Sequence, residues 1–121
     1  MAQKPMQKPY DLEERTFKFS KEVRLFVKTL KKTIGNNEDA KQVIRSSGSV
    51  GSNYIEANEA LSKKDFMYRL KICRKEAKES NYWIRLINET NQQIDKNISE
   101  NLIQESMELK KIFSAIIEKS K

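Results

Sequence analysis

Apolar residues recur along this chain at intervals of three and four positions, in four separate segments. In the first segment, residues 11–33, the positions expected to be buried are Leu12, Thr16, Phe19, Val23, Phe26 and Leu30. In the second segment, residues 38–61, they are Ala40, Val43, Ser47, Val50, Tyr54, Ala57 and Leu61. This spacing follows the 3.6-residue period of an α-helix and not the two-residue period of a strand.

The other two segments continue the same helical pattern. Residues 63–89 place on one face Phe66, Leu70, Cys73, Ala77, Ile84 and Ile87. In residues 98–119 the apolar face consists of Ile98, Leu102, Leu109, Ile112 and Ile116, flanked by Ile103, Met107, Phe113 and Ile117. A polar loop over residues 90–97 separates the two, with Asn97 or Ser99 as the expected cap. Four amphipathic helices with short connections predict an all-α fold, an antiparallel up-down-up-down four-helix bundle.

Residues that cap or end helices set the other expected boundaries. Asp11 is expected to cap the first helix. The sequence Gly35-Asn36-Asn37 is expected to end it, because these residues tolerate positive φ. Ser62, followed three residues later by Asp65, resembles the capping box that opens a helix.

Small residues interrupt the second predicted helix. Gly48 and Gly51 each disfavour a helix by about 1 kcal/mol relative to alanine. A local break is one explanation. We favour the close approach of a neighbouring helix, because Ile44, Gly48, Gly51 and Ile55 share a face.

A chain of 121 residues supports one hydrophobic core. Both prolines lie before Asp11, so residues 1–10 are predicted as a flexible basic tail and residues 11–121 as a single bundle domain. No apolar run approaches the roughly 20 residues of a membrane helix, and the tail lacks the apolar middle of a signal peptide. We therefore expect a cytoplasmic protein without membrane contact, with Cys73 as a reduced, packed thiol.

The formal net charge is +7, and the positive charge is concentrated on the first and third predicted helices. On the third helix one face carries Lys64, Tyr68, Lys71, Lys75, Lys78, Tyr82 and Arg85. On the first helix a second stripe consists of Lys21, Arg24, Lys28, Lys31 and Lys32. Clustered cations bind phosphates through counterion release, and tyrosines stack on unpaired bases. We expect RNA or DNA binding of low specificity; a simple solvated helix face is the alternative.

Diagonal placement would keep these two stripes apart in one monomer, because the first and third helices of such a bundle are not neighbours. The third helix also carries a second apolar strip of Ile72, Trp83 and Leu86. A helix that is apolar on two sides usually has a second protein neighbour. The strip therefore predicts a homo-oligomer, in which the stripes of several copies would meet. The alternative is that Trp83 covers one end of the bundle.

Two pairs of glutamates raise the question of catalysis. Glu56 and Glu59 end the second helix, and Glu76 and Glu79 lie on the third. All-α nucleotide pyrophosphohydrolases of the MazG type hold Mg²⁺ with a similar arrangement, but the tandem glutamate that opens their motif is replaced here by Ile55. We expect ion pairs with Arg45, Arg69 and Arg74, and keep Mg²⁺-dependent hydrolysis as an alternative.

The sequence has no histidine, which excludes imidazole bases and the Arg-His pair of HEPN-type ribonucleases. We expect a non-enzymatic protein without cofactor or metal.

Motifs in the second and third helices resemble those of the 23S rRNA intervening-sequence proteins. They are Arg45-Ser46, Ser49-Val50-x-x-Asn53-x-x-Glu56, Ser62-x-x-Asp65-Phe66, Lys75-Glu76-Ala77 and Tyr82-Trp83. The chain departs from the family at Asn58-Glu59, where many members have glycine. The other two helices agree only in pattern.

The resemblance implies a left-handed bundle that assembles into a ring-like homopentamer, encoded within insertions of bacterial rRNA genes. A similar protein is an accessory factor of a retroelement reverse transcriptase, so a nucleic-acid-processing enzyme is an expected partner. The family brings no catalytic residues. For its motif residues we infer a buried polar network of Arg45, Asn53, Glu56, Glu76 and Glu79. The alternative hypothesis for the function is a protein-interaction scaffold that does not bind nucleic acid directly.

Overall fold

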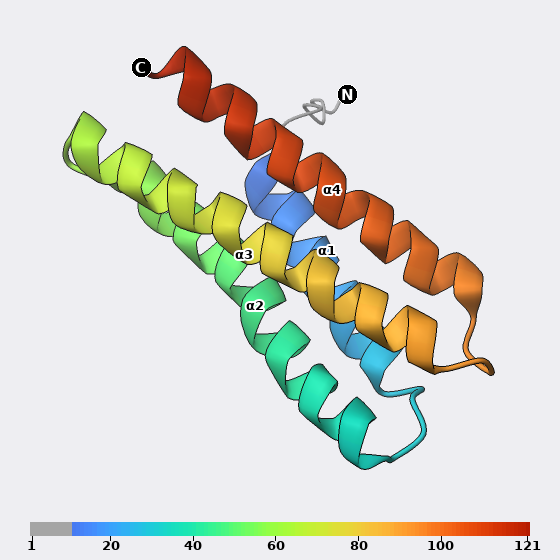
Figure 1. Ribbon diagram of the computed structural model, residues 1–121. Coiled ribbons are helices and arrows are strands. Elements are labelled where there is room, and N and C mark those ends of the chain that lie inside the picture. The colour runs from blue at the N-terminus through green and yellow to red at the C-terminus, as the bar shows by residue number, and fades with distance from the viewer. Residues whose placement is uncertain (1–10) are drawn as a thin grey trace, which may run out of the picture.

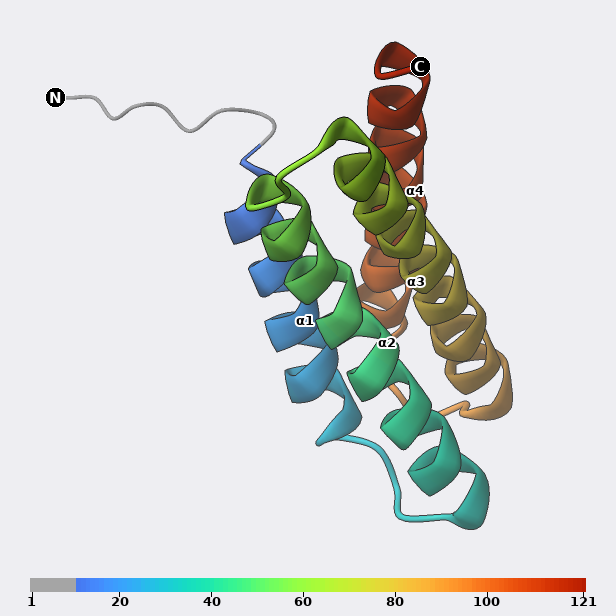
Figure 2. The same ribbon diagram turned by 90° about the vertical axis from the view of Figure 1, so that its left-hand side faces the viewer.

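The computed structural model describes residues 11–121, so the predicted tail over residues 1–10 lies outside the described part. The helices are α1 (Leu12–Val27), α2 (Ile34–Asn58), α3 (Lys63–Thr90) and α4 (Lys96–Lys119). Figures 1 and 2 show them packed side by side in one bundle. Residues 11–121 contain no strand, and the predicted all-α fold is confirmed. No helix of this part is long and apolar enough to cross a membrane.

Hydrogen bonds between helices give their relative direction. Asn53 of α2 is bonded to Arg69 of α3, and Ser46, earlier in α2, is bonded to Ser80, later in α3. These two helices therefore run antiparallel, and successive helices alternate in direction along the whole bundle (Figure 1).

Each helix packs on two others, and the remaining pairs are diagonal. Helix α1 contacts α2 and α4, and α3 contacts the same two, whereas α1 and α3 have no close backbone contact within residues 11–121. The α1–α4 seam is the least closely packed of the four. The expectation that the first and third helices occupy diagonal corners is therefore confirmed.

The buried positions follow the predicted pattern closely in α1 and only partly in α4. All six predicted positions of the first segment are buried. In α4 the core side is rotated, because Phe113 and Ile117 are fully buried while Ile98 is 43% exposed. The rotation brings Ser99 and Ser106 against α3, where they bond Asn88 and Asn81.

The junction of α1 and α2 differs from the prediction. Helix α1 ends at Val27, not near residue 33, and the Thr29 hydroxyl donates to the Phe26 carbonyl at 2.6 Å. Thr33 then caps α2, accepting a hydrogen bond from the Asn36 amide at 3.1 Å. Because Thr33 caps a new helix, residues 35–37 form the first turn of α2 and do not end α1. No described residue has positive φ.

The other boundaries are closer to expectation. Ser62 caps α3 as predicted, accepting from the Asp65 amide at 3.0 Å. The cap of α4 is Asp95, and not Asn97 or Ser99, because its carboxylate already accepts from the first amides of the helix. Since α2 ends at Asn58, Leu61 leaves the predicted core face and is 98% exposed.

The close approach predicted at the glycines of α2 occurs at Gly51. A Cβ atom there would lie 3.0 Å from Thr16 Oγ1 and 3.3 Å from Thr16 Cβ, so α1 presses against the backbone of α2. At Gly48 the nearest atom is 3.6 Å away, on the flexible side chain of Arg24. Helix α2 is unbroken at both positions.

Candidate nucleic-acid interface

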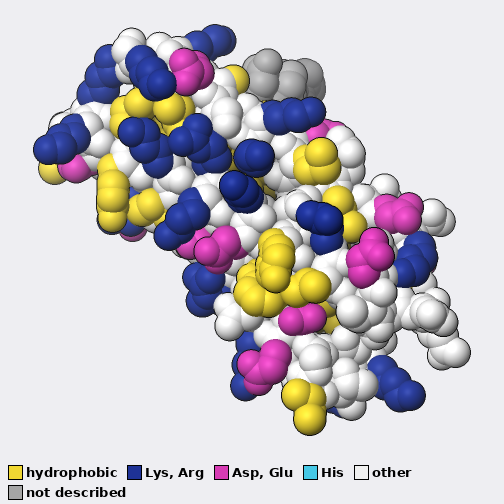
Figure 3. Space-filling model, viewed as in Figure 1, with side chains coloured by type: hydrophobic (Ala, Val, Ile, Leu, Met, Phe, Trp, Pro, Cys, Tyr) yellow, Lys and Arg dark blue, Asp and Glu magenta, His cyan; other side chains and the backbone are white. Residues whose placement is uncertain are grey.

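The α3 stripe is a continuous exposed surface. All seven predicted members, Lys64, Tyr68, Lys71, Lys75, Lys78, Tyr82 and Arg85, are exposed. The opposite side of the helix faces the core, where Leu70, Cys73 and Ile84 have no solvent exposure. In Figure 3 the basic side chains gather over the first half of α3 and the adjoining end of α4. The sequence pattern therefore placed this surface correctly.

The stripe lysines are free of ion pairs. Among residues 11–121, Lys64, Lys71, Lys75 and Lys78 have no carboxylate within salt-bridge distance. Helix α3 carries eight basic and four acidic residues, a net +4. One of the four acids, Glu76, is buried. The exposed basic residues of α3 therefore outnumber the accessible acids of the same helix, which are Asp65, Glu79 and Glu89.

Residues Arg74 and Lys110 extend the basic surface into the α3–α4 seam. Asn81 of α3 donates to Ser106 of α4 at 3.0 Å, which fixes how the helices are aligned. Arg74 lies two turns before Asn81 on the same side, and Lys110 one turn beyond Ser106. Arg74 was expected in an ion pair, which the described residues do not contain. Lys110 was not predicted at all, because α4 is neutral as a whole and its alignment with α3 is not visible from periodicity.

The predicted stripe on the first helix does not exist as one face. Lys21 and Arg24 lie on α1, but Lys28 is its C-cap, and Lys31 and Lys32 lie in the α1–α2 connection. Arg24 is turned toward α2 near Gly48 and donates to Ser20. The physical reason is the early end of α1, which leaves only four basic against three acidic residues on the helix.

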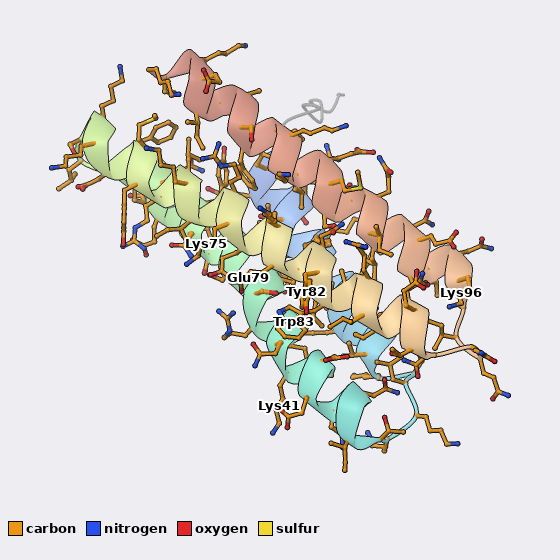
Figure 4. The ribbon with its side chains drawn as sticks, in the orientation of Figure 1. Lys41, Lys75, Glu79, Tyr82, Trp83 and Lys96 are labelled. Atoms are coloured by element: carbon orange, nitrogen blue, oxygen red, sulfur yellow. The ribbon has the colours of Figure 1, made fainter. Side chains whose placement is uncertain are left out.

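The apolar strip on α3 is half-buried along the flank of the bundle. Tyr82 and Trp83 stack edge to face with ring centroids 5.0 Å apart, and Tyr82 is 54% exposed. Trp83 packs partly on the core, and Ile72 and Leu86 are partly exposed. Figures 3 and 4 place the apolar patch of Tyr82 and Trp83 away from the ends of the bundle. The alternative that Trp83 covers an end is therefore wrong.

Four of the five residues assigned to a polar network between α2 and α3 make such contacts. Arg45 lies 3.6 Å from Glu76 and 3.1 Å from Glu79. Asn53 accepts from Arg69 at 2.9 Å. The Glu76 side chain is only 8% exposed, and its Oε1 has no hydrogen-bond partner. The network is thus two separate contacts, and it is not buried as inferred, because the side chains of Arg45 and Glu79 are 55% and 45% exposed.

Glu56 is the exception, because it is exposed and has no ion pair or hydrogen bond to any other member. It lies on the solvent side of α2, about one turn beyond Asn53. Glu59, the second acid of its pair, is exposed as well. Within residues 11–121 no group of three or more acids, cysteines or histidines is placed to hold a metal ion.

The thiol of Cys73 is unreactive at neutral pH. Cys73 is fully buried on the core side of α3, and burial raises its pKa to about 12. At neutral pH the thiol stays protonated, which removes the thiolate that nucleophilic chemistry requires.

Comparison with known proteins identifies relatives of the whole bundle. Residues 8–115 match the family described as 23S rRNA-intervening sequence protein. The fold is also similar to a 1.70 Å crystal structure from Bacteroides thetaiotaomicron VPI-5482, described as a protein with unknown function from the S23 ribosomal protein family. That likeness has a TM-score of 0.74 and 32% identity, and covers 88% of this chain and 97% of that chain. No curated protein matches this chain in sequence.

Proposed function

This chain belongs to the 23S rRNA-intervening sequence protein family, and we propose that it is a non-enzymatic, homo-oligomeric bundle that binds RNA or DNA through α3. The observation that carries the proposal is the exposed stripe of unpaired lysines and tyrosines on that helix. The described relative has unknown function and so suggests no reaction.

The dimensions of the stripe suit a nucleic-acid strand. From Lys64 to Arg85 it extends about 32 Å along the helix, at about 1.5 Å per residue. That length corresponds to about nine phosphates on one strand of a duplex, at about 3.4 Å each. Binding through phosphates alone is insensitive to sequence and falls steeply with salt.

The two tyrosines favour unpaired nucleotides. Tyr68 is 61% exposed and Tyr82 54% exposed, and both lie among the lysines. Rings placed along a cationic track stack on successive bases, which is only possible where the bases are unpaired. We therefore expect single-stranded or looped RNA to bind more tightly than duplex DNA.

Homo-oligomer formation is the second part of the proposal. The partly exposed side chains of Ile72, Trp83 and Leu86 are the proposed contact, and the family resemblance favours five copies. Assembly would place several α3 stripes around one surface, so that one nucleic acid contacts more than one copy.

The direct test is fluorescence anisotropy with labelled single-stranded RNA, structured RNA and duplex DNA. We expect sub-micromolar binding of RNA near physiological salt, and a loss of about tenfold or more in the Lys71→Glu, Lys75→Glu, Lys78→Glu triple variant. The matched control changes Lys28, Lys31 and Lys32 to glutamate, which alters the net charge equally at another place. Binding that survives the α3 change, or falls equally in both variants, would contradict the α3 interface. A protein-interaction scaffold centred on Trp83 would then be the better account.

A further inference from the structure

The α1–α2 connection borders an open pocket, whose lining includes Lys28, Lys31 and Lys32 of the stripe that the sequence predicted for the first helix. Its volume is about 520 Å³, within the range of about 300–1,000 Å³ typical of ligand pockets. The apolar lining consists of Val27, Leu30, Ile34, Ala40 and Ile44. The lysines around it are Lys28, Lys31, Lys32 and Lys41. Figure 2 shows this connection at the end of the bundle opposite the start of α1, and Figure 4 labels Lys41.

The early end of α1 builds this pocket. Because α1 stops at Val27 and α2 starts at Ile34, the chain between them crosses from one helix to the other. Leu30 is the one residue of this crossing that is buried, at 7% exposure. Ile34 cannot reach the core from the first position of α2, and it is 86% exposed. A large aliphatic side chain therefore projects into solvent beside three lysines.

The charge of the pocket is strongly one-sided. Glu38 is its only acid, and it lies 3.9 Å from Lys41. Lys28, Lys31 and Lys32 have no carboxylate within salt-bridge distance in the described chain. Three cations are thus available to an anionic partner.

The lining distinguishes this pocket from the α3 stripe. It contains no aromatic ring, so it offers no surface on which a base can stack. Aliphatic side chains next to lysines instead complement a helix that carries aliphatic residues on one face and carboxylates beside them. Residues 1–10 of this chain do not fit that description, because they contain Lys4 and Lys8 and no acid.

We propose that this pocket docks an acidic amphipathic helix of a partner protein. Aliphatic side chains of the partner would cover Ile34 and Ile44, and its carboxylates would pair with Lys28, Lys31 and Lys32. The site is separate from the proposed nucleic-acid surface on α3 and does not depend on it.

The test is methyl NMR of the intact protein with a defined probe. The probe is a peptide of about four helical turns with leucines on one face and glutamates on the other. A second peptide replaces every leucine by glutamine, and single-stranded RNA is the third arm. We expect the first peptide to shift the methyl signals of Ile34, Ala40 and Ile44, and the other two ligands to leave them in place.

Two variants locate the binding. Ile34→Ser and the triple change of Lys28, Lys31 and Lys32 to glutamate are each expected to weaken the leucine-glutamate peptide about tenfold or more. Leu61→Ser is the matched control, since Leu61 is exposed at another end of the bundle; it should bind normally. The Lys71→Glu, Lys75→Glu, Lys78→Glu variant should also bind normally, which separates this proposal from the α3 interface.

Three results would overturn the proposal. Equal binding of the two peptides would show that charge alone acts. Larger shifts of the same methyls by RNA would assign the pocket to nucleic acid. Contacts to these methyls from a second copy, seen in a mixed-label oligomer, would make it an interface of the protein with itself.

Discussion

Asn36 and Asn91 exchange two side-chain hydrogen bonds, each of 2.8 Å, between the start of α2 and the end of α3. Each amide also donates at 2.9 Å to a carbonyl, Asn36 to Lys31 and Asn91 to Ile87. Asn36 is 5% exposed. This pair therefore fastens the α1–α2 connection to the end of the third helix.

Removing one partner of this pair should destabilise the bundle. Asn36→Ala removes the two side-chain hydrogen bonds to Asn91 and the one to the Lys31 carbonyl, and each such bond contributes about 0.5–1.5 kcal/mol. Asn91→Ala should add little in the variant that already lacks Asn36, because the two side chains act as one unit. Denaturant unfolding of the single and double variants measures this coupling, and strictly additive losses would contradict it.

The contact of α1 with α2 at Gly51 gives a second prediction. Gly51→Ala places a Cβ 3.0 Å from Thr16 Oγ1, and overpacking of this kind costs about 1–3 kcal/mol. Gly35→Ala is the matched control, because no atom lies within 4 Å of its Cβ position. That change should be neutral or stabilise the protein by up to about 1 kcal/mol. Thermal unfolding that ranks the two variants the other way would contradict the close approach.

An arginine clamp across the α1–α4 seam gives a pH-dependent prediction. Arg15 binds Glu105 at 2.7 and 2.8 Å, and Glu108 at 2.7 Å. Hydrogen bonds from Gln104 and then Arg15 lower the pKa of Glu108 below its usual 4.5. A carboxyl with a lowered pKa in the folded state adds stability above its unfolded pKa and loses it as the pH falls.

The stability difference between the wild type and Arg15→Gln should therefore be present at neutral pH. It should shrink as the pH falls below about 4.5 and through the lowered pKa of Glu108. Unfolding free energies of both proteins between neutral and acid pH measure this difference. A difference that stays constant over the whole range would show that the clamp is not electrostatic.

The buried carboxylate of Glu76 gives a fourth prediction. Arg45→Ala removes the nearest cation from a side chain that is 8% exposed, and an uncompensated buried charge is costly. We expect a loss of about 1–3 kcal/mol. Adding Glu76→Gln should restore part of it, because the amide carries no charge. Chemical unfolding of the two variants checks this, and a double variant less stable than Arg45→Ala would contradict it.

Periodicity was sufficient for the core of α1 and for the exposed face of α3. All the residues from Leu12 to Leu30 at the predicted spacing are buried. The predicted end of the first helix was wrong, because two local signals conflict there. Gly35 and Asn36 suggest the end of a helix, whereas Thr33 caps the start of the next one. The hydrogen bond that the Thr33 hydroxyl accepts from the Asn36 amide starts α2 at this point, and only the structure shows that bond.

Features that depend on contacts between helices could not be predicted from the sequence. The apolar band of α4 is wide, and which of its residues face the core depends on the neighbouring helices: Phe113 is buried, with its ring centroid 6.1 Å from that of Tyr54 on α2, whereas Ile98 is 43% exposed. Lys110 joins the basic surface only because α4 runs antiparallel to α3 with Ser106 beside Asn81. Glu56 belongs to the same motif as Asn53, but its side chain is exposed, and the motif alone could not show that the two residues differ in this way.

The salt dependence of RNA binding tests the central claim most directly. The wild type and the Lys71→Glu, Lys75→Glu, Lys78→Glu variant would be titrated with labelled single-stranded RNA at several salt concentrations. Each phosphate contact contributes about 0.7 to the slope of log K against log salt for single strands, so three lost contacts should flatten the slope by about 2. The variant at Lys28, Lys31 and Lys32 should keep the wild-type slope. Equal slopes for the wild type and the α3 variant would contradict phosphate binding by this helix.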